Sequence, residues 1–194
     1  MNYQAAKDFV LDKLHNELSE KLSYHGLHHT LDVLAVAQDL GQQVGLSAKE
    51  MLLLKTAALY HDAGFTISNL NHEELGCGIV RENLPRFGYT AEDIALICGM
   101  IMATKIPQSP KNQLEEILCD ADLDYLGRDD FYSIGATLYT ELHAHDVVKT
   151  EEDWNRIQVG FLERHAYFTA INQKRRTARK MQYLTELKDL VATY

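Results

Sequence analysis

The stretch MLLLKTAALYHDAG, residues 51–64, is apolar over most of its length and ends in the doublet His61-Asp62. Its leucines and alanines recur at three- and four-residue spacing, which predicts a helix that is apolar on most sides and therefore buried. We expect Gly64 to end this helix. A buried imidazole and carboxylate must be paired, hydrogen-bonded or bound to a metal, since burial without a partner is costly. The last helical carbonyls also carry partial negative charge, so this end of the helix suits a cation.

The rest of the chain predicts further helices and no strands. Ser47 and Glu50 have the spacing of a capping box that opens the central helix. We expect an all-α fold, a single compact bundle of about eight or nine helices over residues 1–194, with a motif core at residues 24–126 and C-terminal helices 129–192 packed on it. The expected helices cover residues 3–22, a second segment that Gly41 stops, the central stretch, and residues 71–84, 90–103, 112–126, 131–145, a segment capped by Thr150, and 172–191.

Composition excludes several classes of protein. The 194 residues carry a net charge of −9, which disfavours non-specific nucleic-acid binding and means that an anionic substrate needs local positive charge or a metal. Because the chain has no apolar run of membrane-spanning length and no signal-peptide pattern, we expect a cytoplasmic protein with no membrane partner. Cys77, Cys98 and Cys119 are widely spaced and are expected to be buried, reduced thiols.

Several residues in separate predicted helices could bind a metal. His25 and His29 are four residues apart and so share one helix face. Asp120, Asp122 and Asp124 come late in a predicted helix, where both helix propensity and the helix dipole disfavour them. Each residue alone could be an ordinary hydrogen-bonded group. Together with His61-Asp62 they form a mixed set of nitrogen and oxygen ligands, which suits a divalent ion such as Mn, Mg, Ni, Co, Fe or Zn.

The order of these residues resembles a known family. A histidine in HTLDV (29–33), the doublet in LYHD (59–62) and an aspartate in ADL (121–123) together resemble the HD superfamily of metal-dependent phosphohydrolases. The resemblance covers about residues 24–126 and implies the HD-type helical fold. It also implies the metal ligands His29, His61, Asp62 and Asp122. Within the family pattern, the apolar residues before the aspartate select Asp122, and Asp120 remains the alternative.

Two further residues receive catalytic roles. The segment YHGLHHTLDV (24–33) also looks like the Y-H-N-x-x-H-x-x-D-V segment of cyclic-nucleotide phosphodiesterases, although Gly26 stands where that pattern has asparagine. In that family the earlier histidine donates a proton to the leaving oxygen, which implies this role for His25. Asp62 or Glu73 is expected to accept a proton from water. Alternatively, Glu73 caps the helix that starts there, or His72 and Glu73 bind a second metal.

Three cations are candidates for binding the phosphate of a substrate: Lys55, Lys105 and Arg128. A solvated surface position is the alternative for each. Residues 174–180 form a basic stretch, which is expected to be a solvated helix face.

We therefore expect metal-dependent hydrolysis of a phosphate ester, either a monoester or a diester, of a nucleotide or another small phosphorylated metabolite. Because four ligands are accounted for and no histidines for a second ion are evident, we expect one ion. Two alternatives are a di-iron oxygenase of the HD type, and a regulatory module that binds metal and nucleotide without turnover.

Overall fold

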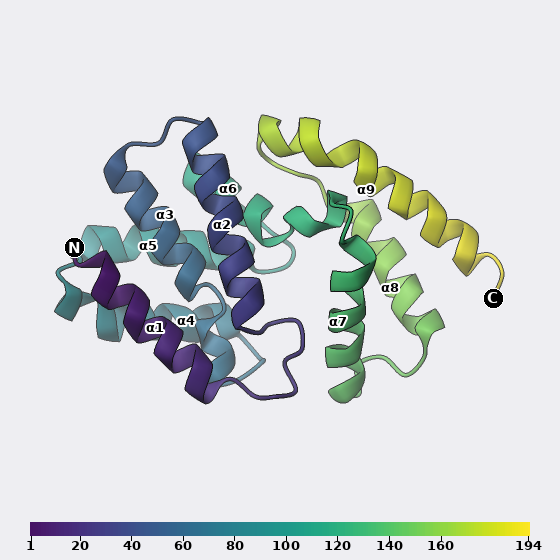
Figure 1. Cartoon of the computed structure of the whole chain (residues 1–194), viewed down its shortest axis with the longest axis horizontal. Coiled ribbons are helices and arrows are strands. Elements are labelled where there is room, and N and C mark those ends of the chain that lie inside the picture. Colours follow the sequence, from purple (N-terminus) through teal and green to yellow (C-terminus); the bar gives the residue numbers. More distant parts are fainter. The chain divides into compact units, whose positions relative to one another are not determined.

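The computed structural model describes all residues, 1–194, and consists of nine α-helices and short 3₁₀ turns without strands, as predicted (Figure 1). The chain divides into two compact units. The first comprises Met1–Glu20 and His25–Asp122, and the second Lys21–Tyr24 and Leu123–Tyr194. A single domain with its C-terminal helices packed on the motif core stays a prediction.

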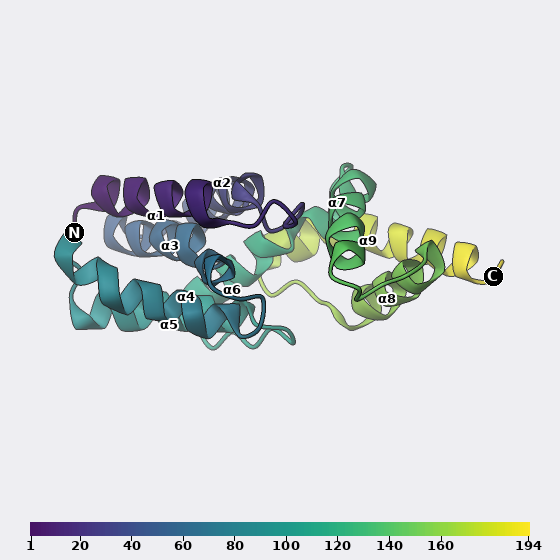
Figure 2. The ribbon, with the colours of Figure 1, turned by 90° about the horizontal axis from the view of Figure 1, so that it is seen from below.

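The first unit is organised around α3, Ala48–Tyr60, the helix that the apolar stretch predicts. Its leucines and alanines are buried, and Ser47 and Glu50 form the expected capping box. The helix contacts α1, α2, α5 and α6. Figure 2 shows α1 and α3 side by side, with α4 and α5 beneath them. The other elements of this unit are α1 (Tyr3–Glu17), α2 (Leu27–Gln43), η1 (Ala63–Thr66), α4 (His72–Asn83), η2 (Leu84–Phe87), α5 (Ala91–Thr104) and α6 (Gln113–Asp122).

The two glycines that were expected to end helices have a different function. Helix α2 runs through Gly41 to Gln43, and α3 ends at Tyr60, before Gly64 is reached. A Cβ atom at Gly64 would lie 1.9 Å from the backbone carbonyl oxygen of His72, and one at Gly41 would lie 2.7 Å from the side chain of Met51. Both glycines therefore permit close packing between elements. At Gly64 this packing holds the turn after the His61-Asp62 doublet against the start of α4.

Two helices are shorter than predicted. Helix α1 ends at Glu17 rather than near residue 22, because Leu18 is already extended. Helix α6 ends at Asp122 rather than near residue 126, and the 3₁₀ turn η3, Asp124–Gly127, follows it. The prediction was too long in both cases because the apolar pattern continues past the helix ends, where residues such as Leu22 and Leu126 still pack into the core. Asp122 is consequently the last helical residue.

The second unit contains η3, α7 (Phe131–Ala144), α8 (Glu151–Arg164) and α9 (Ala170–Val191). Thr150 caps α8 as expected. The unit has its own core, formed by Tyr24, Leu123, Tyr125, Leu126, Phe131, Leu162, Tyr167, Tyr183, Leu184 and Leu187.

The basic stretch at residues 174–180 is only partly the solvated face that was expected. Arg176 donates through Nε and Nη2 to the two carboxylate oxygens of Asp124, at 2.8 and 2.9 Å. Lys180 is buried and donates to the backbone carbonyls of Leu162 and His165, near the end of α8. These two cations therefore tie α9 to its own unit.

The expectation of buried, reduced thiols is confirmed for all three cysteines. None of the helices has both the length and the apolar character needed to cross a membrane.

Candidate metal centre

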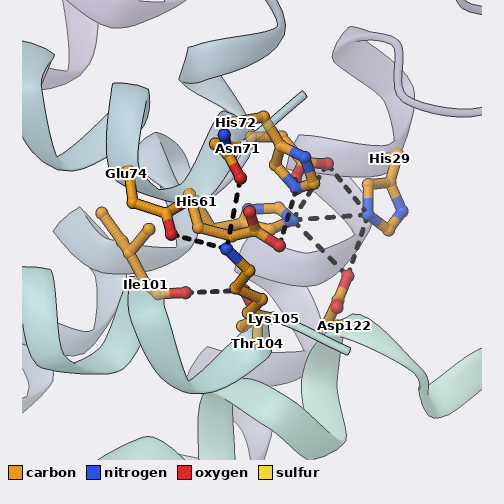
Figure 3. A network of polar contacts seen from close by, with 11 residues as sticks. His29, His61, Asn71, His72, Glu74, Ile101, Thr104, Lys105 and Asp122 are labelled. Atoms are coloured by element: carbon orange, nitrogen blue, oxygen red, sulfur yellow. Dashed lines mark hydrogen bonds and ion pairs between the residues drawn. The ribbon is translucent and has the colours of Figure 1, made fainter. Parts of the chain in front are cut away.

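Three helices of the first unit bring four of the predicted site residues together. His29 lies in the first turn of α2, His61 and Asp62 directly follow α3, and Asp122 ends α6. Helix α3 contacts both α2 and α6, and α2 and α6 contact each other. The side chains of His29, His61 and Asp122 consequently point toward one another (Figure 3).

The facing atoms of these side chains are closely spaced. The Nε2 atoms of His29 and His61 are 3.4 Å apart, and Asp122 Oδ1 lies 3.1 Å from the first and 3.5 Å from the second. Asp62 Oδ2 lies 3.4 Å and 3.2 Å from the same two nitrogens. His29, His61 and Asp62 are almost fully buried, and Asp122 is slightly more exposed. These polar side chains are therefore largely shielded from water.

The facing atoms are predominantly acceptors. His61 Nδ1 lies 2.8 Å from the carbonyl oxygen of Ala58, and because a carbonyl can only accept, Nδ1 carries a hydrogen. When the ring of His61 is neutral, its Nε2 atom therefore carries a lone pair and can only accept. This atom faces the carboxylates of Asp62 and Asp122 and an imidazole nitrogen of His29. Asp62 Oδ2 is buried and has no hydrogen-bond donor. Such a group of acceptors requires a cation among them.

The arrangement fits a metal ion. Bonds of roughly 2.0–2.2 Å place neighbouring nitrogen and oxygen ligands about 3–3.5 Å apart. The three ligand atoms of His29, His61 and Asp122 meet this requirement, and Asp62 Oδ2 is suitably placed beside them. The backbone bond to His61 Nδ1 is the kind of outer contact that fixes the ring of a metal-bound histidine. Asp120 is fully buried and does not belong to this group.

Electrostatics point to the same need for positive charge. Burial lowers the pKa of His61, but the carboxylates of Asp62 and Asp122 outweigh burial and raise that pKa well above its usual value. Burial likewise raises the pKa values of Asp62 and Asp122, but the adjacent histidines outweigh it and hold both well below the usual range. Without an ion, a proton on His61 therefore supplies the missing cation.

Phe65 supports two further histidines beside the cluster. Its ring stacks on His25, with the ring centres 4.3 Å apart, and on His72, at 4.0 Å. The ring of His25 is 5.9 Å from that of His29. His25 therefore lies next to His29, but the two do not share a helix face as was expected, because α2 begins only at Leu27, with Gly26 as its extended N-cap.

His72 and Glu73 open α4 on the other side of Asp62. His72 Nε2 lies 3.6 Å from Asp62 Oδ1 and 3.5 Å from Glu73 Oε1, and Glu73 is buried. Asp62 therefore presents one oxygen to His29 and His61 and the other to His72. No side-chain cap hydrogen bond was found at the start of α4, where the N-cap is Asn71.

One of the three predicted substrate-binding cations lies near this group. Lys105, at the end of α5, donates to Glu74 Oε1 at 2.5 Å and to Asn71 Oδ1 at 3.5 Å (Figure 3). Lys55 instead lies over the ring of Tyr3, 4.7 Å from its centre. The structure thus brings Lys105, but not Lys55, to the residues that flank His72 and Glu73.

Arg128 belongs to the second unit. Its guanidinium donates to both carboxylate oxygens of Asp130, at 2.9 and 2.6 Å, and lies 3.8 Å from Asp124. A role for Arg128 in substrate binding stays a prediction.

Sequence reasoning did not identify Phe65 or the pairing of Glu74 with Lys105. An aromatic residue three positions after the His61-Asp62 doublet is a local signal that could have indicated Phe65. Glu74 and Lys105 are 31 residues apart, and no local spacing predicts their contact.

The comparisons with known proteins identify the family of this chain. The model of the HD domain family matches residues 26–124, which is 99 of the 194 residues, and the match includes all four predicted ligands. The chain therefore belongs to the HD domain family, a family of metal-dependent hydrolases. No curated protein matches the sequence.

Two solved structures share the fold. One is the crystal structure of a predicted HD superfamily hydrolase from an uncultured Thermotogales bacterium, at 17% identity and a TM-score of 0.63, covering 96% of this chain and 91% of that one. The other is a structural-genomics target from Lactobacillus plantarum, at 17% identity and a TM-score of 0.66, covering 100% of this chain and 98% of that one. Both likenesses concern the fold alone.

Proposed function

We propose that this protein is a phosphohydrolase that cleaves a phosphate ester of a nucleotide or another small phosphorylated metabolite, with one divalent ion held by His29, His61, Asp62 and Asp122. The observation that carries the proposal is the group of buried acceptor atoms around His61 Nε2, including the donorless Asp62 Oδ2. When bound there, a divalent ion supplies a water whose pKa falls from 15.7 toward about 7, and it polarises a phosphoryl oxygen.

Glu73 and Asp62 are the proposed acceptors of the water proton. Both carboxylates are buried and face His72 Nε2, at 3.5 and 3.6 Å. His72 Nε2 lies close to both carboxylates, and the second oxygen of Asp62, Oδ2, lies beside His29 and His61. General-base catalysis of this kind contributes roughly 10²- to 10⁴-fold to a rate.

His25 is the proposed donor of a proton to the leaving oxygen. It is half-buried, its ring packs on Phe65, and it lies beside His29 without belonging to the closest group of ligand atoms. Because the ring of His25 is not needed to bind the ion, its nitrogens can serve in proton transfer instead.

The proposal is tested by metal analysis of the purified chain, coupled to a hydrolysis screen. The screen compares nucleoside mono-, di-, tri- and cyclic phosphates and simple phosphate esters with Mn, Mg, Ni and Co. We expect one ion per chain and release of phosphate or of a phosphomonoester, both lost in His29→Ala. A metal-loaded protein that binds nucleotides but leaves them intact would be a regulatory module. Two irons per chain with oxygen-dependent substrate loss would identify an oxygenase.

A further inference from the structure

The charge around the candidate metal centre is unfavourable for an anionic substrate. Asp62, Asp122 and Glu73 contribute three carboxylates, and a divalent ion would leave this group with a net charge of about −1. The whole chain also carries a charge of −9. A phosphate ester therefore needs an additional cation beside the ion.

Lys105 is placed to be that cation. Its ammonium reaches Glu74 and Asn71, which adjoin His72 and Glu73 in the sequence, and Figure 3 shows it pointing toward the same group of side chains. The hydrogen bond to Glu74 is the main cause of a raised pKa at Lys105, and the negative charge of Glu73 adds to it. Four other cations of the first unit have partners elsewhere: Lys13 with Glu17, Lys49 with Asp93, Lys55 with Tyr3, and Arg86 with Phe9 and Phe87.

Lys105 is already neutralised by Glu74. The Nζ–Oε1 distance is 2.5 Å, and both side chains are more than two-fifths exposed, so the contact can exchange with a ligand in solution. Glu74 lies in the first turn of α4, the start of which packs closely against Gly64. An anion that approaches the ion must consequently compete with Glu74 for Lys105.

We propose that the Lys105–Glu74 pair selects phosphate monoesters over diesters at this site; the inference rests on the proposed function. A monoester phosphate carries close to two negative charges above its second pKa of about 6 and outcompetes the single charge of a carboxylate. A diester phosphate carries one charge and competes with Glu74 on equal terms. Glu74 thus disfavours monoanions, while Lys105 binds the dianion that displaces Glu74.

Binding of inorganic phosphate tests this selection directly. Calorimetry at about pH 8, above the second pKa of ~6 of phosphate esters, compares inorganic phosphate with dimethyl phosphate on the full chain loaded with stoichiometric Mn²⁺. Lys105→Met should weaken phosphate binding by about 10- to 100-fold, because it removes a charged hydrogen-bond donor. Glu74→Gln should tighten phosphate binding by about 2- to 5-fold, the range of an exposed ion pair.

The two substitutions must also depend on each other. In Lys105→Met the gain from Glu74→Gln should largely vanish, because Glu74 acts by occupying Lys105. The control is Lys13–Glu17 on α1, a partly exposed pair at the same 2.5 Å distance in the same unit. Lys13→Met and Glu17→Gln should leave phosphate affinity unchanged. Both pairs lie at the surface, and circular dichroism confirms that each variant is folded.

Several outcomes would overturn the inference. Lys105→Met and Lys13→Met could have equal effects, or Glu74→Gln could bind phosphate more weakly. The wild type could also fail to bind phosphate, or bind dimethyl phosphate as tightly as phosphate or more tightly. Hydrolysis assays separate this inference from the proposed function. The expected binding pattern without hydrolysis of any ester would refute the function alone. Hydrolysis with a KM that neither Lys105→Met nor Glu74→Gln changes would refute the selection alone.

Discussion

Asp122 and Asp124 are two residues apart, yet their surroundings are opposite. Asp122, in the first unit, faces the imidazole nitrogens of His29 and His61. Asp124, in the second unit, is fully buried and accepts hydrogen bonds from Arg176 at 2.8 and 2.9 Å and from Asn172 at 3.1 Å. A buried carboxylate among donors is already neutralised and ties structure together, whereas one among acceptors still requires a cation. Surroundings rather than residue type separate a structural aspartate from a metal ligand.

The largest expected effect comes from exchanging the two aspartates for asparagine. Asp122→Asn should lose the bound ion. Its activity should fall by more than the roughly 10- to 100-fold that is typical when a residue supporting a metal ligand is replaced. Asp124→Asn should keep the ion but lower the free energy of unfolding by about 2–4 kcal/mol, because Arg176 loses its charged partner and is only partly exposed. Metal analysis and urea unfolding measure the two effects. Metal loss in Asp124→Asn would remove the distinction.

The next comparison lies within the first unit, between residues that hold the ion and His25 beside them. His25→Ala should keep the ion and reduce turnover by roughly 10²- to 10⁴-fold for esters with a poor leaving group. The loss should be much smaller for an activated aryl phosphate, whose leaving oxygen needs no proton. His28→Ala, an exposed neighbour on α2, is the matched control. Equal losses on both substrates would make His25 a structural residue.

Two glycines near α4 test how the metal centre is assembled. Gly64→Ala should lower the free energy of unfolding by about 1–3 kcal/mol, because its Cβ atom would collide with the backbone of His72. It should also lower turnover by displacing His72 and Glu73. Gly78→Ala, where a Cβ meets nothing within 4 Å, should instead raise stability by up to about 1 kcal/mol. Thermal unfolding of both variants measures the contrast, and equal stability would contradict it.

The most gradual expected effect is the pH dependence of the metal-free protein, which spreads over several pH units. The raised pKa of His61 contributes stability below its unfolded value of about 6.5, and this is lost as pH rises through the folded pKa. The lowered pKa values of Asp62 and Asp122 contribute stability above about 3.9, which is lost as pH falls through the folded values.

Stability of the metal-free protein should therefore be greatest between about pH 4 and 6.5 and then fall by up to about 1.4 kcal/mol per pH unit. Bound metal should remove most of this fall, because the ion replaces the proton on His61. Unfolding by urea at several pH values, with and without Mn²⁺, measures the difference. A metal-free protein that becomes more stable above pH 6.5 would contradict the expected protonation of His61.

Much of the first unit was predictable from the sequence because the signals are local. Apolar residues at helical spacing predicted α3 and its burial, and the doublet at its end predicted a buried imidazole and carboxylate. The ordered motif also indicated His29 and Asp122, and the structure places both beside His61. Gly41 and Gly64 were misinterpreted as helix ends, since a glycine needed for close packing looks identical in sequence to one that terminates a helix.

The all-α class, the central helix and the residues able to bind an ion could be predicted from the residues alone, because helical periodicity and the spacing of histidines and aspartates are properties of short segments. Tertiary structure alone decided that Asp122 faces acceptors while Asp124 faces Arg176, and that Glu74 meets Lys105. It also decided that the chain divides into two compact units. The physical reason is that the charge and hydrogen-bonding character of a side chain's surroundings come from segments distant in the sequence, which meet only after the helices pack.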